Sequence, residues 1–186
     1  MDTRSKKEVY KDLQKIHKNV SLTTISLIDS KTGLNSLSGK SFSKTICCNE
    51  NGYYMIIDSD RYGFNNPDYE WNKKTQDILI IGDSFAYGAC VNRPNDIASV
   101  IRKKTKRSVI SLGLPANGPL RELASIKEYS TPKVNLIIWF YFEGNDLAEL
   151  GYETENNTLK NYLTNREFSQ NLKNKQEEID ELVEKK

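Results

Sequence analysis

Histidine, cysteine and long apolar runs are all scarce in this sequence. Its 186 residues include one histidine, His17, and three cysteines, Cys47, Cys48 and Cys90. The cysteines lack the paired spacing of zinc ligands, and one histidine adds little to them, so we expect no metal site and no cofactor. The longest apolar run, VNLIIWFYF, is far shorter than the roughly 20 residues that span a bilayer, so we expect no membrane span in this chain.

The excess of charge of either sign is also small. The chain has 27 basic and 25 acidic residues, a formal net charge of +2, which is too little to indicate a nucleic-acid partner. We interpret the basic segments SKK, NKK and RKKTKR, which are spread among acidic residues, as solvated surface. Charged residues make up 28% and hydrophobic residues 37%, which is compatible with one globular domain and an appendage.

The chain begins without a recognisable export signal. Its first residues, MDTRSKKEVYKDLQKIHK, are charged and lack the apolar core of a signal peptide, although the chain could be a piece of a longer exported protein. Adjacent cysteines rarely bond each other because the geometry is strained. Either all three cysteines are reduced, or one of the adjacent pair bonds Cys90. A Cys48–Cys90 disulfide would imply an oxidising compartment.

Composition divides the chain into three regions. Residues 1–70 form an N-terminal extension with a short helical pattern, the strand candidates NVSLTTISLID and YYMIID, and an irregular stretch over residues 30–52. Residues 71–150 form an α/β core. Residues 151–186 form a C-terminal helical segment, whose last part, NKQEEIDELVEKK, has charge pairs at helical spacing.

The α/β core alternates strands and helices. DILIIG is an apolar run without polar alternation, which is typical of a strand buried on both faces. We predict a helix over residues 95–104, a strand at SVISLG, a helix over residues 119–129 and a third strand at VNLIIWFYF. This order predicts a parallel sheet with helical crossovers, in which ligands bind at the carboxyl ends of the strands.

A polar turn follows each of the three strands. The first strand ends in Gly82, Asp83 and Ser84, the second leads into GLPANGP at residues 113–119, and the third runs into EGND at residues 143–146. If the strands are neighbours, the three turns meet at one edge of the sheet. A serine at a sharp strand-to-helix turn is exposed for nucleophilic attack.

Taken in this order, the three turns resemble the sequence blocks of the SGNH hydrolases, also called GDSL esterases and lipases. The resemblance covers about residues 77–150 and implies a three-layer, flavodoxin-like α/β fold with a parallel sheet. It implies that Ser84 in GDSF is the nucleophile and that its N–H, the Ala116 N–H and the Asn145 side chain form an oxyanion hole. The supporting positions in the same blocks are Gly82, Asp83, Gly113, Asn117 and Asp146.

The sequence departs from the family's pattern at several positions. Ala116 stands where the family usually has a donor glycine, and alanine resists positive φ. Glu143 replaces the glycine that opens the third block. The family's base is a histidine in a late Asp-x-x-His block, and here Asp180 is followed by ELVEKK. His17 comes in the wrong order for that role, so we interpret it as a surface residue.

The predicted sheet is also incomplete, because it has fewer strands than the family's sheet usually has. The exposed flank of such a sheet needs a cover, and the N-terminal strands and the C-terminal helix are two candidates for it. A further C-terminal segment or a partner chain is the third, and either would complete the site as well as the sheet.

We therefore predict an SGNH-type serine ester hydrolase or acyltransferase that acts on O-acyl esters of carbohydrates or lipids, with little activity alone because the base is missing. The alternative is a non-catalytic SGNH-like module, or a truncated fragment, that binds an acyl or glycan ligand. A nucleotide-binding βαβ domain ranks last, since neither GxGxxG nor a Walker motif occurs. The segments DRYGFNNP and EGNDL resemble those of bacterial cell-envelope proteins, which suggests the envelope or periplasm.

Overall fold

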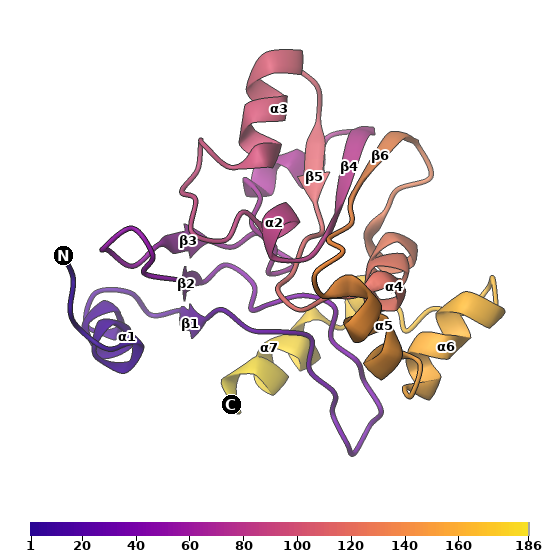
Figure 1. The fold of residues 1–186 in the computed structure, drawn as a ribbon, viewed down its shortest axis with the longest axis horizontal. Coiled ribbons are helices and arrows are strands. Elements are labelled where there is room, and N and C mark those ends of the chain that lie inside the picture. The colour runs from indigo at the N-terminus through magenta and orange to yellow at the C-terminus, as the bar shows by residue number, and fades with distance from the viewer. Residues whose placement is uncertain (186) are drawn as a thin grey trace.

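A computed structural model of the chain describes residues 1–185 (Figure 1). The helices are α1 (Lys6–Gln14), α2 (Ser84–Tyr87), α3 (Ile97–Thr105), α4 (Pro119–Tyr129), α5 (Asp146–Glu153), α6 (Asn157–Thr164) and α7 (Gln176–Glu184), with the 3₁₀ turns η1 (Asp68–Asn72) and η2 (Leu172–Asn174). The strands are β1 (Val20–Leu22), β2 (Lys44–Ile46), β3 (Ile56–Asp58), β4 (Gln76–Gly82), β5 (Val109–Ser111) and β6 (Val134–Phe140). None of the helices within residues 1–185 is both long and apolar enough to cross a membrane.

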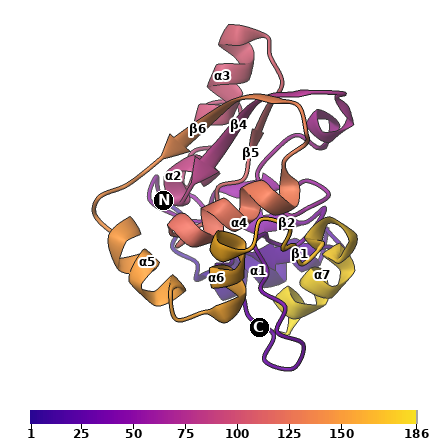
Figure 2. The ribbon, with the colours of Figure 1, turned by 90° about the vertical axis from the view of Figure 1, so that its right-hand side faces the viewer.

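The larger sheet has the strand order β5-β4-β6, and β4 is parallel to both neighbours. Helices cover β4 on its two faces (Figure 2). Ile80 packs with Ala98 of α3 on one face, and Leu79 packs with Ala124 of α4 on the other. Burial on both faces explains why the β4 sequence is apolar without alternation. The protein is therefore α/β, with a parallel sheet between two helical layers.

The smaller sheet has the order β1-β2-β3, with β1 parallel and β3 antiparallel to β2. α1 covers it with Val9, which packs against Val20 and Ile46. β2 lies within residues 30–52, which we predicted to be irregular, so that prediction is wrong at Lys44–Ile46. This strand is three residues long and is specified by its two neighbours in the sheet, which no local pattern shows.

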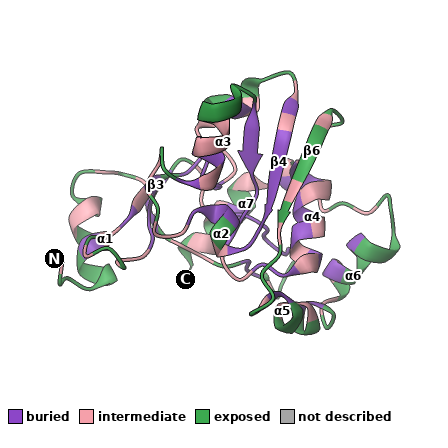
Figure 3. Ribbon diagram, turned by 45° about the horizontal axis from the view of Figure 1, so that its top comes forward, coloured by how far each residue is buried: buried purple, intermediate pink, exposed green. Residues whose placement is uncertain are grey.

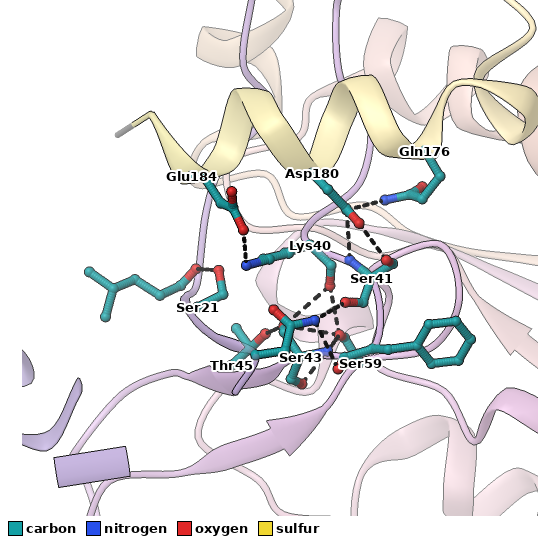
Figure 4. Close-up of polar contacts among 12 residues, drawn as sticks. Ser21, Lys40, Ser41, Ser43, Thr45, Ser59, Gln176, Asp180 and Glu184 are labelled. Atoms are coloured by element: carbon teal, nitrogen blue, oxygen red, sulfur yellow. Dashed lines mark hydrogen bonds and ion pairs between the residues drawn. The ribbon is translucent and has the colours of Figure 1, made fainter. Parts of the chain in front are cut away.

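The C-terminal helix α7 lies beside the N-terminal sheet and away from β6 (Figures 1 and 2). The Asp180 carboxylate accepts hydrogen bonds from Ser41 N at 2.8 Å and from Ser41 Oγ at 2.5 Å (Figure 4). Lys40 Nζ forms an ion pair with Glu184 at 2.5 Å (Figure 4). These contacts give Asp180 a structural partner in the N-terminal region.

One core cluster takes side chains from all three regions that composition distinguishes. Leu37 comes from residues 1–70, Ile110 from the α/β core and Leu172 from the C-terminal segment, and all three are fully buried. The three regions therefore bury apolar surface against one another, and this shared burial stabilises them as one packed unit.

β6 is an edge strand with a free side. Within residues 1–185 it pairs only with β4, since β1, β2 and β3 form a sheet of their own. The exposed fractions of Leu136, Ile137 and Trp139 are 47%, 45% and 52%. Figure 3 shows β6 largely exposed beside a mostly buried β4. Neither the N-terminal strands nor the C-terminal helix covers this flank, so both of these candidates for its cover are ruled out.

Candidate functional site

Ser84 is the first residue of α2, and only Asp83 separates it from the central strand β4. The turn that presents it depends on Gly82, whose φ is +145° and whose missing Cβ would lie 2.8 Å from the Phe140 carbonyl oxygen. Asp83 is the N-cap of α2, and its Oδ1 accepts a hydrogen bond from Phe85 N at 3.0 Å. Ser84 therefore stands at the carboxyl end of the central strand, where a parallel sheet binds ligands.

The second turn begins at Gly113, which lies against the backbone of α2. A Cβ at Gly113 would lie 2.3 Å from Tyr87 N, so this glycine is required by close packing. Its N–H donates to Ser111 Oγ at 3.3 Å, which leaves the Ala116 peptide as the donor in this turn. Leu114 N donates to the Gly82 carbonyl at 3.4 Å and joins the second turn to the first.

Ala116 has φ of +59°, in the left-handed region that favours glycine. Holding an L-residue with a Cβ there costs about 1–2 kcal/mol. The next side chain, Asn117, accepts a hydrogen bond from Ser26 Oγ at 2.9 Å, and its own Nδ2 is buried without a partner among the described residues. Within residues 1–185 no hydrogen bond links either residue to Ser84.

The third turn follows β6 and contains Asn145 and Asp146. Asn145 Nδ2 lies 3.5 Å from Asp83 Oδ2, which brings the third turn against the turn of the nucleophile candidate. Asp146 Oδ2 accepts a hydrogen bond from Phe142 N at 2.6 Å and closes its own turn, and burial raises the pKa of this carboxyl. In the described chain, Asn145 Oδ1 and Asp146 Oδ1 are buried and unpartnered.

A cavity of about 270 Å³ adjoins Ser84 and is lined in part by Phe85, Val91 and Ile97. Among residues 1–185, no side chain forms a hydrogen bond with Ser84 Oγ. His17 follows α1, which packs against β1 and β2 in the N-terminal region. The structure therefore brings together Ser84, Asp83 and Asn145 but supplies no base within that range.

A disulfide bond joins Cys48 to Cys90, with a Cα–Cα distance of 5.4 Å, and Cys47 is a buried free thiol. Cys90 also lines the cavity beside Ser84. The bond therefore ties the loop after α2 to the segment that precedes β3. It closes a separation of 42 residues, and a link of that length removes much of the conformational freedom of the unfolded chain.

Glu153 of α5 was missed from the sequence. Its buried carboxylate accepts hydrogen bonds from Gly118 N at 2.7 Å and Leu120 N at 2.8 Å, and Arg121 Nη1 lies 3.2 Å from it. α4 has no side-chain cap of its own, so Glu153 satisfies its first N–H groups from another helix. Desolvation raises the pKa of Glu153. No local motif could reveal a cap that comes from 33 residues away.

Glu122 was also missed. It is 2% exposed, and its Oε2 accepts a hydrogen bond from Trp139 Nε1 of β6 at 2.6 Å. Its Oε1 is buried without a partner in the described chain, and burial raises its pKa to about 8. In the sequence it is an ordinary acidic residue in the first turn of a helix. Acidic side chains are common there because they interact favourably with the helix dipole, so the sequence gives no sign that this one is buried.

The residues that the structure describes contain no group of three or more histidine, cysteine or acidic side chains that could hold a metal ion. Comparison of the chain with known proteins gives no match to a family model, to a curated protein or to a solved structure. The resemblance to SGNH hydrolases therefore rests on the residues of the three turns.

Proposed function

We propose that this chain carries the nucleophile and oxyanion hole of an SGNH-type serine ester hydrolase that acts on O-acyl esters of carbohydrates or lipids. The observation that carries the proposal is the approach of Asn145 Nδ2 to Asp83 Oδ2 at 3.5 Å. It brings an amide donor beside the turn that presents Ser84 at the carboxyl end of the central strand.

In the proposed reaction, Ser84 Oγ forms a bond to the acyl carbon while its proton passes to a base. The bond from that carbon to the alcohol oxygen then breaks, the alcohol takes the proton, and water later releases the acyl group from Ser84. The Ser84 N–H, the Ala116 N–H and the Asn145 amide hold the oxyanion. The Asn145–Asp83 contact is at the long limit for a hydrogen bond, so the amide can turn to a substrate oxygen at little cost.

The cavity beside Ser84 supports a small acyl group. Its volume of about 270 Å³ is just below the roughly 300–1,000 Å³ that is usual for ligand sites, so it suits only a small group. The side chains of Phe85, Val91 and Ile97 in its lining are apolar and suit the hydrocarbon part of an acyl group.

In this proposal the base comes from outside residues 1–185, on a further C-terminal segment or a partner chain that pairs with β6. The free edge of β6 and its exposed apolar side chains support this arrangement. So do Glu122 Oε1, Asn145 Oδ1 and Asp146 Oδ1, which lie buried and unpartnered in the described chain. Each such group costs about 1–3 kcal/mol, so a segment that supplies partners stabilises this edge.

The finer fold assignment belongs to the same proposal. The order β5-β4-β6 puts the first strand of the core between the second and the third, and flavodoxin-like sheets begin in this way. The Cys48–Cys90 disulfide supports the cell envelope or periplasm as the location, because such bonds persist in oxidising compartments.

Labelling with a fluorophosphonate probe tests the role of Ser84, with imidazole added in solution to stand in for the missing base. We expect labelling that rises with imidazole, is lost in Ser84→Ala and is unchanged in Ser30→Ala, an exposed control serine. Asn145→Ala should slow labelling by about 10²–10³-fold because one oxyanion donor is lost, and the exposed control Asn161→Ala should not. Equal labelling of Ser84→Ala and the unchanged chain contradicts the proposal.

A non-catalytic acyl-binding module is the second candidate, and the absence of a base within residues 1–185 favours it. Binding of an O-acetylated sugar that survives Ser84→Ala, together with no hydrolysis of p-nitrophenyl acetate in imidazole, would support it. Ser84-dependent turnover of that ester would exclude it.

A further inference from the structure

A second and larger cavity, of about 650 Å³, lies between η1 and α3. It opens near the amino ends of β4 and β5, whereas Ser84 stands at a carboxyl end, and the two cavities share no lining residue. Its lining includes the basic side chains Lys73, Arg93, Arg102, Lys103, Lys106 and Arg107. We call it the basic cavity.

The positive charge of the basic cavity is only slightly compensated. Among the described residues, Glu70 is the one acidic residue of its lining, and it is 2% exposed and already paired. Its carboxylate pairs with Lys73 Nζ at 2.8 Å and accepts hydrogen bonds from Ser108 Oγ at 3.1 Å and Val109 N at 3.3 Å. Within residues 1–185, none of the other five basic lining residues forms an ion pair. A cavity with this balance attracts an anion.

Two of the three lining arginines, Arg93 and Arg102, differ in how far their donors are used. Arg102 donates to the Val109 carbonyl at 2.8 Å and to Asn66 Oδ1 at 2.7 Å, so its guanidinium is held in place. Arg93 donates through Nη2 to the Asp58 carbonyl at 2.7 Å, while its Nη1 is buried without a partner in the described chain. A guanidinium with a spare donor suits a phosphate or carboxylate oxygen.

The basic cavity also offers a surface for a ring. Tyr69 lines it with 61% of its side chain exposed, and Pro67 and Pro94 add apolar contact. Lys73 Nζ lies 5.8 Å from the centre of the Tyr69 ring, which places a cation beside the aromatic face. An apolar wall with a few charged groups is the usual construction of a small-molecule site, and the volume is in the usual range of about 300–1,000 Å³.

We propose that the basic cavity binds a sugar that carries a phosphate or carboxylate group. The anionic group contacts Arg93 and the lining side chains Lys103, Lys106 and Arg107. The sugar ring packs against Tyr69. A nucleic acid would instead need a basic stripe that follows several phosphates, and these charges converge on one cavity. The proposal does not depend on Ser84, so either one can fail without the other.

Isothermal titration of the whole chain tests the proposal with glucose 1-phosphate, glucuronate, glucose and inorganic phosphate as probes. We expect saturable binding of at least one of the two sugar anions, weaker binding of inorganic phosphate by about tenfold, and none of glucose. The double variant Lys103→Glu/Arg107→Glu should weaken binding by about 10–100-fold. Lys104→Glu/Lys160→Glu makes the same change of charge at exposed lysines outside the lining and should change affinity less than twofold.

Tyr69→Ala should weaken the sugar anion by about tenfold and leave inorganic phosphate unchanged, because it removes only the ring contact. Circular dichroism of each variant checks that it is folded, and Arg93 is left intact since it also holds the Asp58 carbonyl. Equal affinity of the two double variants would overturn the proposal. So would inorganic phosphate as tight as both sugar anions, or a single-stranded oligonucleotide that binds more tightly than either.

Discussion

β4 and β6 are neighbouring parallel strands of seven residues each, and both are rich in branched apolar side chains. Leu79 and Ile80 of β4 are 0% exposed, whereas Ile137 of β6 is 45% exposed. Their sequences are similar, so the difference arises from their neighbours. Leu79 and Ile80 of β4 pack against α4 and α3 on the two faces of the sheet, whereas in the described chain nothing pairs with the outer side of β6. An apolar strand thus shows that a cover is needed, and only its neighbours show whether the cover is present.

The largest expected effect compares Leu79 with Ile137, which are partners in the β4–β6 register. Leu79→Ala should lower the free energy of unfolding by about 2–5 kcal/mol, because it leaves a cavity in a packed core. Ile137→Ala should lower it by less than about 1 kcal/mol, because the side chain is already half in water. Urea denaturation of both variants measures the difference.

Equal losses for the two variants would mean that β6 is as buried as β4 in solution, for instance through association of two copies. Sedimentation at two protein concentrations separates that outcome from a monomer. If the loss of unfolding free energy in Ile137→Ala grows with protein concentration, β6 is buried by association and does not differ from β4 in the way described.

The second effect concerns Glu122 of α4, whose carboxylate accepts a hydrogen bond from Trp139 of β6. Its pKa rises from 4.5 to about 8 in the folded protein, so folding favours the protonated form. The resulting stability is complete below pH 4.5 and is lost as pH rises towards 8. At about 1.4 kcal/mol per pH unit between these values, the loss from pH 5 to pH 7 is about 2–3 kcal/mol.

Glu122→Gln should remove this part of the pH dependence, since the amide cannot ionise and its oxygen can still accept from Trp139 Nε1. Glu143→Gln, at an exposed position after β6, should keep it. Asp60, whose pKa burial raises to about 6, contributes to both variants alike, so the difference between them reports Glu122. Identical pH profiles from urea denaturation at pH 5 and pH 7 would contradict the assignment.

The smallest effect is on tryptophan fluorescence. Trp139 is 52% exposed, while Trp71 is partly buried and donates from Nε1 to Asp60 Oδ2 at 2.8 Å. Acrylamide should therefore quench Trp139 more strongly than Trp71. Trp139→Phe should remove the strongly quenched component, and Trp71→Phe should leave it. A polypeptide that covers β6 should protect Trp139 from quenching, which makes the same measurement a test of the proposed completing segment.

Local patterns predicted much of the α/β core. The β4 run, the helix at Pro119–Tyr129 and the strand at Val134–Phe140 all lie where apolar periodicity indicated. The N-terminal region was harder, because its strands are three residues long and are specified by one another. The predicted strand NVSLTTISLID shrinks to Val20–Leu22, and the C-terminal helical pattern divides into α6, η2 and α7.

The residues of the candidate site also include some that the sequence could indicate and some that it could not. Sequence order was enough to mark the turns of Ser84 and Asn145 as candidates for one edge, because parallel strands end together. It could not show the Glu153 cap on α4, the buried Glu122 or the convergence of Arg93 with basic side chains of α3 and Arg107 on one cavity. Each of these depends on residues far apart in the chain, and burial and charge balance exist only once the chain has packed.

By itself the sequence determined that the core strands run parallel and that a serine follows the first of them, because these follow from local apolar runs and turn residues. Tertiary structure decided which strand is covered, which carboxylates are buried and where the basic residues gather. Burial and local charge depend on residues that are close in space but distant in the chain. Whether β6 has a neighbouring strand is likewise decided only when the sheet forms.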